Sequence, residues 1–416
     1  MGLAWLRWLL AALLLLLLAL RLRGVLWPHH QQLLLPVVVV PGYATSQLEA
    51  QLTHLYRPSS PRCGEQQGKG WFRLYLNQTA LQNDPAGVLC FAEQMTTVYD
   101  RLSGDYYNLP GVETNVPSFG SVAGLRFPDP DNTSISYMDA FLSRLERAGY
   151  RDGETLFGAP YDFRYAVAPP RHRSSVGAAY FRRLKRLVEK ASRRSGGAPV
   201  TVVANSLGGP LAYHFLLLQS LPWRRRFVRR FVPVAAPWGG VVSVMFALVY
   251  GNGLGLDGVD PMNLRGEYRS LQSKLWLLPT PRVFGEGDGA APLVTTRRRN
   301  YTASVGGMGA FLADAGIQEA VEPYETRVVP MFRELPSPRV PVDCVVGVGV
   351  GTLERMVYAG DKVDDRKMPA MVMGDGDGLV NLASLVAVDP AGVEAARGLL
   401  QHAQGAQCGA HGYTQR

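Results

Sequence analysis

The chain has 416 residues, of which 47% are hydrophobic and 10% aromatic. This length and composition suit one large α/β domain with insertions, or two domains, and they exclude a mostly disordered chain. The net charge of +9 favours polyanions such as anionic lipid headgroups. Because the sequence contains no recognition-helix, zinc or RNA-binding motif, we expect no nucleic-acid partner.

Residues 1–24 have the pattern of a targeting segment. Arg7 precedes a leucine-rich run over residues 8–20, and Arg21 and Arg23 follow it. A basic start with a short apolar core is typical of a secretory signal peptide or a signal anchor, since a full membrane span needs about 20 apolar residues. Both interpretations stay open, because no clean small-x-small cleavage site is present. Either one predicts the secretory pathway: the extracellular space, an endomembrane lumen, or a vacuole or lysosome.

The cysteines and sequons agree with a secretory compartment. Four cysteines allow three disulfide connectivities, which the sequence leaves open: Cys63, Cys90, Cys344 and Cys408. Asn-x-Ser/Thr sequons predict surface glycosylation at Asn77, Asn132 and Asn300.

The folded domain is expected to begin at residues 33–40, an apolar, β-branched run that a Pro-Gly pair ends. Such a run predicts a buried parallel strand that feeds a turn. Residues 53–70 are polar and predict an excursion out of the core, with Trp71 and Phe72 as an apolar patch. Residues 103–135 are rich in Gly, Pro and Asn and are predicted to be loop.

Helices and strands then alternate. Apolar spacing predicts helices over residues 136–148 and 176–194, the second with an almost wholly basic outer face. Residues 200–204 predict a buried strand, followed by a helix that runs to about residue 221. A further buried strand is expected over residues 231–235.

Residues 239–335 do not show this alternation of strands and helices, and their Gly/Pro-rich stretches predict a cap or lid inserted over the sheet. The pattern of core strands resumes over residues 341–347 and 368–373. Strands that alternate with helices predict an α/β fold whose mainly parallel sheet carries helices on both faces.

Ser206 lies where the strand over residues 200–204 meets the next helix. Ala204 and Gly208 flank it at two residues' distance, which is the A-x-S-x-G form of the G-x-S-x-G nucleophile elbow. The alternative is an ordinary serine in a buried strand-turn-helix. The flanking strand and helix favour the elbow, so Ser206 is the predicted nucleophile.

A serine hydroxyl needs a general base, and that base needs an acid, in the chain order Ser, acid, His. After Ser206, a predicted strand ends with Asp375 and Asp377 at the carboxyl edge of the sheet. The Asp-Gly alternation is similar to a calcium loop, but its bidentate Glu is missing, so no metal is expected. His402 and His411 follow the acids, and we favour His411 because it lies in an expected loop rather than a helix.

An oxyanion hole needs two backbone amides. One is expected at Leu207, immediately after the nucleophile, and the other in the loop at Pro41-Gly42-Tyr43. Loss of one donor typically lowers the rate about a hundredfold or more.

Five short motifs resemble, in order, those of the lecithin:cholesterol acyltransferase family, from about residue 36 to residue 386. They are Pro41-Gly42-Tyr43 with Gln47-Leu48-Glu49-Ala50, and residues 158–164, 204–208, 236–240 and 374–380. This family includes lysosomal phospholipase and plant acyltransferase-like enzymes.

The resemblance implies an α/β-hydrolase core over residues 33–386. It also implies a small membrane-binding subdomain at about residues 50–95 and a cap at about residues 239–335. Members move an acyl chain from a glycerophospholipid, through an acyl-serine, to a sterol or other lipid alcohol, or to water. No cofactor is implied, and the partners are the phospholipid membrane surface and lipid substrates.

By motif, the resemblance assigns Ser206 as the nucleophile and Asp377, rather than Asp375, as the acid. Tyr43 and Leu207 match the oxyanion donors.

The resemblance also implies a disulfide between Cys63 and Cys90 that closes the membrane-binding loop. Trp71 and Phe72 inside that loop then look like the patch that touches the bilayer. Asn300 sits where a family sequon does.

The tail, residues 387–416, departs from the family pattern, because members continue past the catalytic histidine and this sequence ends five residues after His411. Cys344 fits a family cysteine whose partner position holds no cysteine here, so Cys408 is its substitute or stays a free thiol. Asn205 replaces the His of animal members, with little expected effect. A catalytically impaired lipid-binding relative is therefore the alternative function.

Overall fold

The structure is a computed structural model that describes residues 34–286, 289–364 and 366–388. The predicted targeting segment, residues 1–24, lies outside the described residues. So do most of the divergent tail and with it His402, His411 and Cys408. The fold below concerns the compact unit that begins at Pro36.

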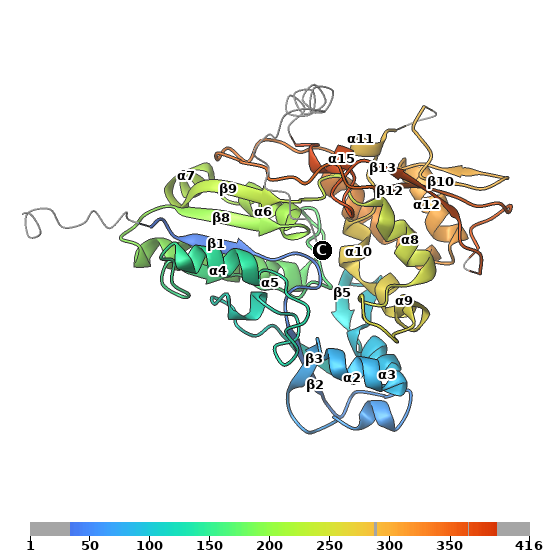
Figure 1. The fold of residues 1–416 in the computed structure, drawn as a ribbon, viewed down its shortest axis with the longest axis horizontal. Helices are drawn as coiled ribbons and strands as arrows, with labels where there is room; N and C mark the ends of the chain where they lie inside the picture. Colours follow the sequence, from blue (N-terminus) through green and yellow to red (C-terminus); the bar gives the residue numbers. More distant parts are fainter. Residues whose placement is uncertain (1–33, 287–288, 365, 389–416) are drawn as a thin grey trace, which may run out of the picture. The chain divides into compact units, whose positions relative to one another are not determined.

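The main sheet of this unit is parallel and has four strands in the order β7-β1-β8-β9, of which β1, β8 and β9 are labelled in Figure 1. The strands are β1 (Val37–Val40), β7 (Leu156–Gly158), β8 (Val200–Asn205) and β9 (Val228–Val234). Residues 341–346 continue the sheet beside β9 through bridges from Phe231 to Val342 and from Val234 to Val345. The predicted α/β fold with a parallel sheet is confirmed.

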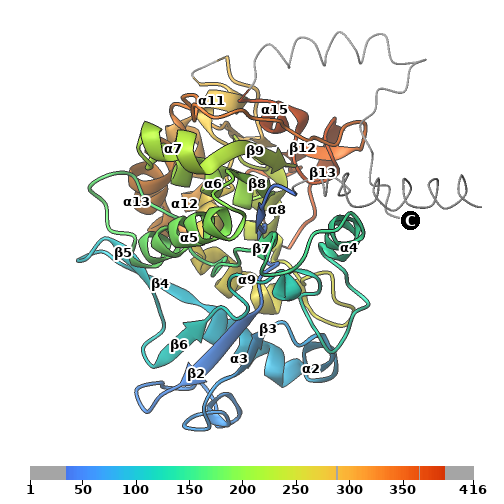
Figure 2. The same ribbon diagram turned by 90° about the vertical axis from the view of Figure 1, so that its left-hand side faces the viewer.

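Helices cover both faces of this sheet, as the alternation along β1 requires. Val38 and Val40 belong to the same core cluster as the buried residues of α5 (Ser175–Arg194) and α6 (Gly208–Leu217). Val37 and Val39 pack instead with Met138 and Leu142, which belong to the α4 side (Asp139–Arg147) (Figure 2). A fourth helix, α7 (Leu221–Phe227), contacts β9.

The helix predictions are confirmed with changed ends. The helix expected over residues 136–148 begins only at Asp139. The helix after Ser206 ends at Leu217 rather than near residue 221, because the side chain of Ser220 caps a new helix, α7, by accepting from Trp223 N at 3.4 Å.

The disulfide-bonded subdomain combines an antiparallel sheet with two helices. Its strands are β2 (Leu48–Leu52), β3 (Phe72–Tyr75) and β6 (Val112–Asn115), in the order β3-β2-β6. The helices α2 (Gln78–Asn83) and α3 (Pro85–Met95) follow β3. Cys63 and Cys90 form the predicted disulfide, which joins the short 3-10 helix Arg62–Gly64 to α3.

The prediction of loop over residues 103–135 is wrong in part. A hairpin of β4 (Thr97–Asp100) and β5 (Asp105–Asn108) extends into this range, β6 lies in it, and a 3-10 helix spans Ala123–Leu125. Its Gly, Pro and Asn residues form the turns between strands of only four residues, and such strands carry too little periodicity to be recognised.

A second sheet has the order β11-β10-β12-β13. Its strands are β10 (Val294–Thr295), β11 (Asn300–Tyr301), β12 (Thr352–Val357) and β13 (Ala370–Gly374). The expectation that residues 368–373 continue the pattern of core strands is corrected: β13 pairs antiparallel with β12, and Met371 and Met373 are 45% and 53% exposed. A short apolar run does not distinguish a core strand from an exposed one.

The region proposed as a cap, residues 239–335, is mainly helical. Its helices are α8 (Val242–Tyr250), α9 (Pro261–Ser270), α10 (Gln272–Trp276), α11 (Pro281–Phe284), α12 (Val305–Asp314), α13 (Val321–Pro323) and α14 (Val329–Phe332). A 3-10 helix at Gln318–Ala320 and a π-helical segment at Tyr324–Val328 complete it, and α15 (Leu382–Leu385) follows β13.

Candidate active site

Ser206 sits on a sharp turn between β8 and α6. Its φ of +48° lies in the left-handed region, which a residue with a side chain rarely adopts. Its own amide donates to the carbonyl of Val234 on β9 at 2.8 Å, and its carbonyl accepts from Gly209 at 2.8 Å. These bonds hold a strained turn whose side chain projects from the carboxyl edge of the sheet, as a nucleophile elbow requires.

The turn fits only because small residues surround it. A Cβ at Gly208 would lie 2.3 Å from the carbonyl oxygen of Pro41, and one at Gly42 would lie 2.9 Å from the Cβ of Ser206. The loop after β1 therefore touches the elbow directly.

Tyr137 connects the loop after β1 to the turn at Ser206 through hydrogen bonds. Tyr137 accepts a hydrogen bond from the amide of Gly42 at 3.2 Å and donates one to the side-chain oxygen of Asn205. Burial raises the pKa of Tyr137 to about 12, so the phenol stays protonated and able to donate. We missed this role of Asn205, because no local pattern pairs residues 68 positions apart.

The amides of Tyr43 and Leu207 flank the serine, one on each segment. Among the described residues, neither N–H donates to a protein acceptor. Two such N–H groups beside a serine can receive the oxyanion of a tetrahedral intermediate.

Asp377 is held at the end of β13. Its Oδ1 accepts from the amides of Leu379 at 2.9 Å and Val380 at 2.7 Å. A Cβ at Gly347 would lie 3.0 Å from the Cβ of Asp377, so this acid lies against the segment beside β9.

That segment leads back to the elbow. Val345 donates to Pro233 at 2.9 Å and accepts from Ala235 at 2.8 Å, and the neighbouring Val234 accepts the Ser206 amide. Asp377 is thus connected to the serine through β9 and one neighbouring segment. Asp375, by contrast, is exposed, and its Oδ1 accepts from Gly349 at 2.7 Å.

The described residues include three histidines: His54, His172 and His214. None of them forms a hydrogen bond with Ser206 or Asp377. His54 and His172 are exposed, whereas His214 is buried against Trp276 and Phe332.

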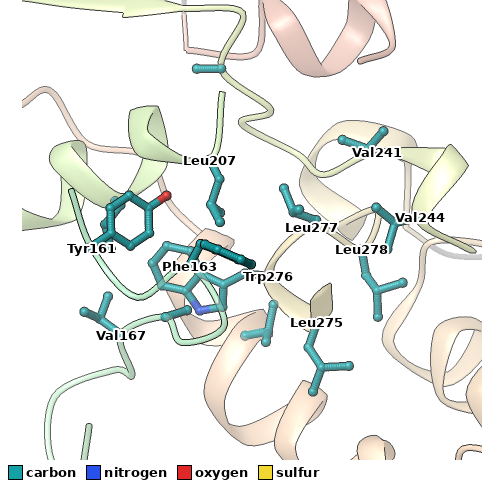
Figure 3. Packing of buried hydrophobic residues seen from close by; sticks show 14 of the residues in the cluster. Tyr161, Phe163, Val167, Leu207, Val241, Val244, Leu275, Trp276, Leu277 and Leu278 are labelled. Atoms are coloured by element: carbon teal, nitrogen blue, oxygen red, sulfur yellow. The ribbon is translucent and has the colours of Figure 1, made fainter. Parts of the chain in front are cut away.

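Apolar side chains surround the elbow. Figure 3 shows Leu207 opposite Trp276 and Leu277, with Tyr161 and Phe163 beside it. All five belong to one buried cluster, so the elbow faces a region that suits a hydrocarbon chain better than a charged substrate.

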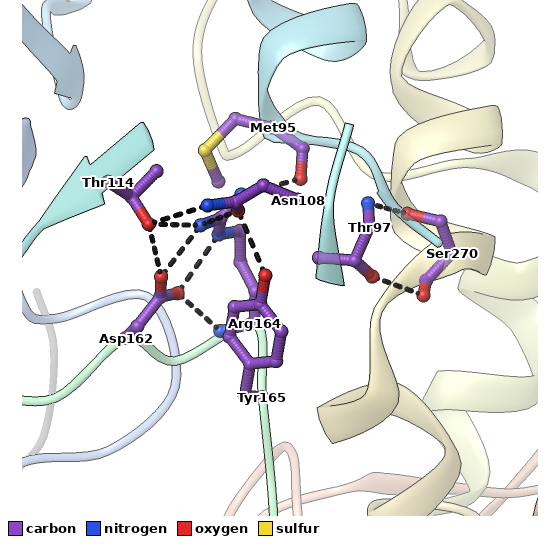
Figure 4. Close-up of polar contacts among 8 residues, drawn as sticks. All are labelled: Met95, Thr97, Asn108, Thr114, Asp162, Arg164, Tyr165 and Ser270. Atoms are coloured by element: carbon purple, nitrogen blue, oxygen red, sulfur yellow. Dashed lines mark hydrogen bonds and ion pairs between the residues drawn. The ribbon is translucent and has the colours of Figure 1, made fainter. Parts of the chain in front are cut away.

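A buried ion pair connects the disulfide-bonded subdomain to the core (Figure 4). Arg164 is fully buried and forms a two-point contact with Asp162, at 2.9 Å from Nε and 2.6 Å from Nη2. Its guanidinium also donates to the carbonyl of Met95 at 3.2 Å, to Asn108 at 2.7 Å and to Thr114 at 3.0 Å. The Asp-Phe-Arg part of the 158–164 motif therefore has a structural role between segments.

Comparison with known proteins agrees with this geometry. Residues 71–304 match the family model described as lecithin:cholesterol acyltransferase. A rice protein named lecithin-cholesterol acyltransferase-like 1 is 46% identical over 361 residues, which cover 86% of this chain and 79% of that protein. The chain belongs to the lecithin:cholesterol acyltransferase family.

Other members of the lecithin:cholesterol acyltransferase family are also similar. Human lysosomal phospholipase A and acyltransferase is 32% identical, covering 84% of this chain and 80% of its own. Rat phosphatidylcholine-sterol acyltransferase is 31% identical, covering 78% and 69%. Members of this family are acyltransferases and phospholipases, and the chain is accordingly an acyltransferase/phospholipase of lipid metabolism.

The disulfide-bonded subdomain carries the side chains that we expected at the membrane. Trp71 is 50% exposed, whereas Phe72 is partly buried and packs with the cluster of Leu52, Tyr56 and Val112. Trp71 directly precedes β3 and is the more exposed member of the pair. Within the described part of the chain, every helix is too short or too polar to cross a bilayer.

The sequon residues differ in their surroundings. Asn77 caps α2 by accepting from Ala80 at 3.0 Å, and Asn132 is half-buried. Asn300 is exposed on β11. Cys344 is exposed as well. Among the described residues, no group of three or more His, Cys, Asp or Glu is arranged to hold a metal ion.

Proposed function

We propose that this protein transfers a fatty acyl chain from a glycerophospholipid to Ser206, and then to a sterol or other lipid alcohol, or to water. One observation carries the proposal: Ser206 occupies a left-handed turn between two segments whose amides, at Tyr43 and Leu207, donate to no acceptor among the described residues. The apolar side chains around Leu207 support an acyl substrate.

In the first half-reaction, the Ser206 oxygen attacks the ester carbonyl carbon while an imidazole takes the serine proton. The amides of Tyr43 and Leu207 receive the negative carbonyl oxygen. The intermediate then collapses, and the lysophospholipid leaves with the proton from the imidazole. In the second half-reaction the acceptor hydroxyl repeats these steps on the acyl-serine, which restores Ser206.

We assign the imidazole to His411, with His402 as the alternative, and its orientation to Asp377. The support for Asp377 is its fixed carboxylate, since Oδ1 is held by two amides while Oδ2 has no hydrogen-bond partner within the described residues. An aspartate held in this way keeps a histidine in the tautomer that accepts the serine proton.

We further propose that the disulfide-bonded subdomain contacts the membrane through Trp71, with Phe72 supporting it from behind. Leu55 and Leu89, which are 56% and 54% exposed, belong to the same subdomain. The Trp71→Ala variant is expected to lower vesicle binding severalfold while hydrolysis of a dispersed short-chain ester stays unchanged.

We also propose a secretory location, supported by the predicted targeting segment, residues 1–24, and by the exposed sequon at Asn300. Removal of N-glycans from protein made in a eukaryotic host should shift the mass of the wild type and shift that of Asn300→Gln less.

The central experiment combines a fluorophosphonate probe with product analysis. The probe should label the wild type and not Ser206→Ala. A phospholipid with different chains at its two positions, given with and without sterol, then identifies the acyl chain that moves and its acceptor. Labelling that survives Ser206→Ala would overturn the proposal. Vesicle binding with no labelling and no acyl release would favour the catalytically impaired, lipid-binding alternative.

A further inference from the structure

The side-chain nitrogen of Lys274, on α10, lies in a buried position against two aromatic rings. The residue is 2% exposed. Nζ lies 2.8 Å from the centre of the Tyr43 ring and 4.1 Å from that of Tyr268. Burial of a charge is costly without compensation, and the faces of two aromatic rings supply part of it.

Glu267 on α9 is the acidic residue that acts electrostatically on Lys274. It is 6% exposed, and burial raises the pKa of its carboxyl to about 8, although the positive charges of Lys274 and Arg164 act in the other direction. Burial likewise lowers the pKa of Lys274 well below its usual value, against the attraction of Glu267. Replacement of a buried ionisable pair by apolar side chains of similar volume is often neutral or stabilising, so the pair is weak evidence of a stabilising role.

The ring under the Lys274 nitrogen belongs to the residue whose amide is the proposed oxyanion donor. Tyr43 directly follows Gly42, where a Cβ would lie 2.9 Å from that of Ser206. Phe163 packs edge-on against the Tyr43 ring at 5.1 Å. The ring is therefore held between Phe163 and Lys274, and its backbone has little freedom to move.

The helix that carries Lys274 also faces the elbow. Leu275, Trp276 and Leu277 follow it in the chain, and Figure 3 shows Trp276 and Leu277 across from Leu207. A short segment thus contacts the surroundings of both proposed oxyanion donors.

We propose that Lys274 is a positioning residue of the acyl-transfer site, which holds the Tyr43 ring and so fixes the Tyr43 amide, with Glu267 as its acidic partner. This inference rests on the proposed function of Ser206. The competing explanation is that the pair is only a buried charge pair of the fold.

The first experiment measures kcat and KM of Lys274→Met on phospholipid vesicles. Methionine has a similar length and no charge, so we expect kcat to fall about tenfold to a hundredfold, which is at most the loss from removing one oxyanion donor, and KM to change less than about twofold. Lys274→Arg should recover part of this loss. The exposed Lys362→Met is the matched control and should keep the wild-type kcat.

The second experiment is a double-mutant cycle with the ring. Tyr43→Phe keeps the ring face and should retain most activity, whereas Tyr43→Leu should lower kcat. Tyr43→Leu combined with Lys274→Met should be no slower than the slower single variant, because both changes release the same amide. Additive losses would contradict the proposal.

The third experiment separates positioning from folding. Lys274→Met with Glu267→Gln removes both ionisable groups, and we expect it to regain thermal stability but not kcat. If Lys274→Met alone does not fold, the kcat of this double variant is compared with that of the wild type instead. Recovery of kcat together with stability would overturn the inference, as would a folded Lys274→Met with wild-type kcat. Fluorophosphonate labelling of the wild type at Ser206 keeps these outcomes distinct from failure of the proposed function.

Discussion

The hydroxyl of Tyr137 donates a hydrogen bond to the side-chain oxygen of Asn205, the residue before the candidate nucleophile. The Tyr137→Phe variant removes this bond and leaves the amide of Gly42 without its acceptor. A hydrogen bond contributes about 1 kcal/mol to stability, and a buried unpaired group costs about 1–3 kcal/mol. Because the lost contacts hold the turn beside Ser206, we expect kcat to fall roughly tenfold, equivalent to about 1.4 kcal/mol of transition-state stabilisation. Steady-state kinetics on a soluble ester measures it. Tyr107→Phe, at an exposed position, is the control. Equal rates for the two variants would contradict a role of the Tyr137 hydrogen bonds in holding the turn.

Two glycine substitutions should have opposite effects. Gly208→Ala places a methyl group 2.3 Å from the backbone oxygen of Pro41, so we expect a loss of about 1–3 kcal/mol in unfolding free energy and of most activity. Gly266→Ala on α9 meets nothing within 4 Å and should stabilise the protein by about 0.5–1 kcal/mol, since alanine favours helix. Urea unfolding measures both, and a stable, active Gly208→Ala would show that the elbow is less confined than described.

The Arg164–Asp162 pair should be among the most sensitive positions for stability. Arg164→Met leaves a buried carboxylate without its partner, which typically costs on the order of 3–5 kcal/mol. Arg151→Met breaks an exposed pair with Glu154, whose side chains are 75% and 63% exposed, and should change stability by less than about 0.5 kcal/mol. Thermal unfolding of the two variants under identical conditions tests this contrast, and similar melting temperatures would refute it.

His214 should make the fold sensitive to acid. Burial lowers its pKa to about 3, and its Nε2 has no partner among the described residues, so it is neutral in the folded protein. In the unfolded chain its pKa is about 6.5. The contribution of His214 to stability is therefore complete above about pH 6.5 and is lost progressively as the pH falls toward 3.

The measurement is urea unfolding of the wild type and His214→Leu between pH 7 and pH 4. The wild type should lose roughly 3 kcal/mol more over this interval than the variant does. His172→Leu, at an exposed position, controls for the loss of an imidazole. Parallel pH curves for the wild type and His214→Leu would contradict the prediction.

Local pattern was sufficient for the parts of the fold that short-range physics determines. The valine run of β1 and the β-branched run of β8 predicted buried parallel strands, and the structure has both. The confined turn at Ser206 was also predictable, because it requires the small residue that the sequence shows at Gly208. The end of β13 could be placed, but not its antiparallel pairing with β12, since pairing depends on distant residues.

Long-range partners were beyond prediction for the same reason. Nothing adjacent to Lys274 in the sequence indicates that its ammonium lies on the ring of Tyr43, more than two hundred residues earlier. Asn205 gave no local sign of its bond to Tyr137. Such contacts are created by packing of whole elements, and they surround the candidate site that the motif indicates.

The buried contacts of Arg164 have a consequence for the way the molecule denatures. They span the end of α3, the strands β5 and β6, and the loop after β7, and one apolar cluster continues from Leu74 and Phe91 to Leu211. A subdomain that shares its interior with the main sheet has no separate melting transition. Calorimetry should therefore record a single cooperative endotherm, in which the van't Hoff and calorimetric enthalpies agree.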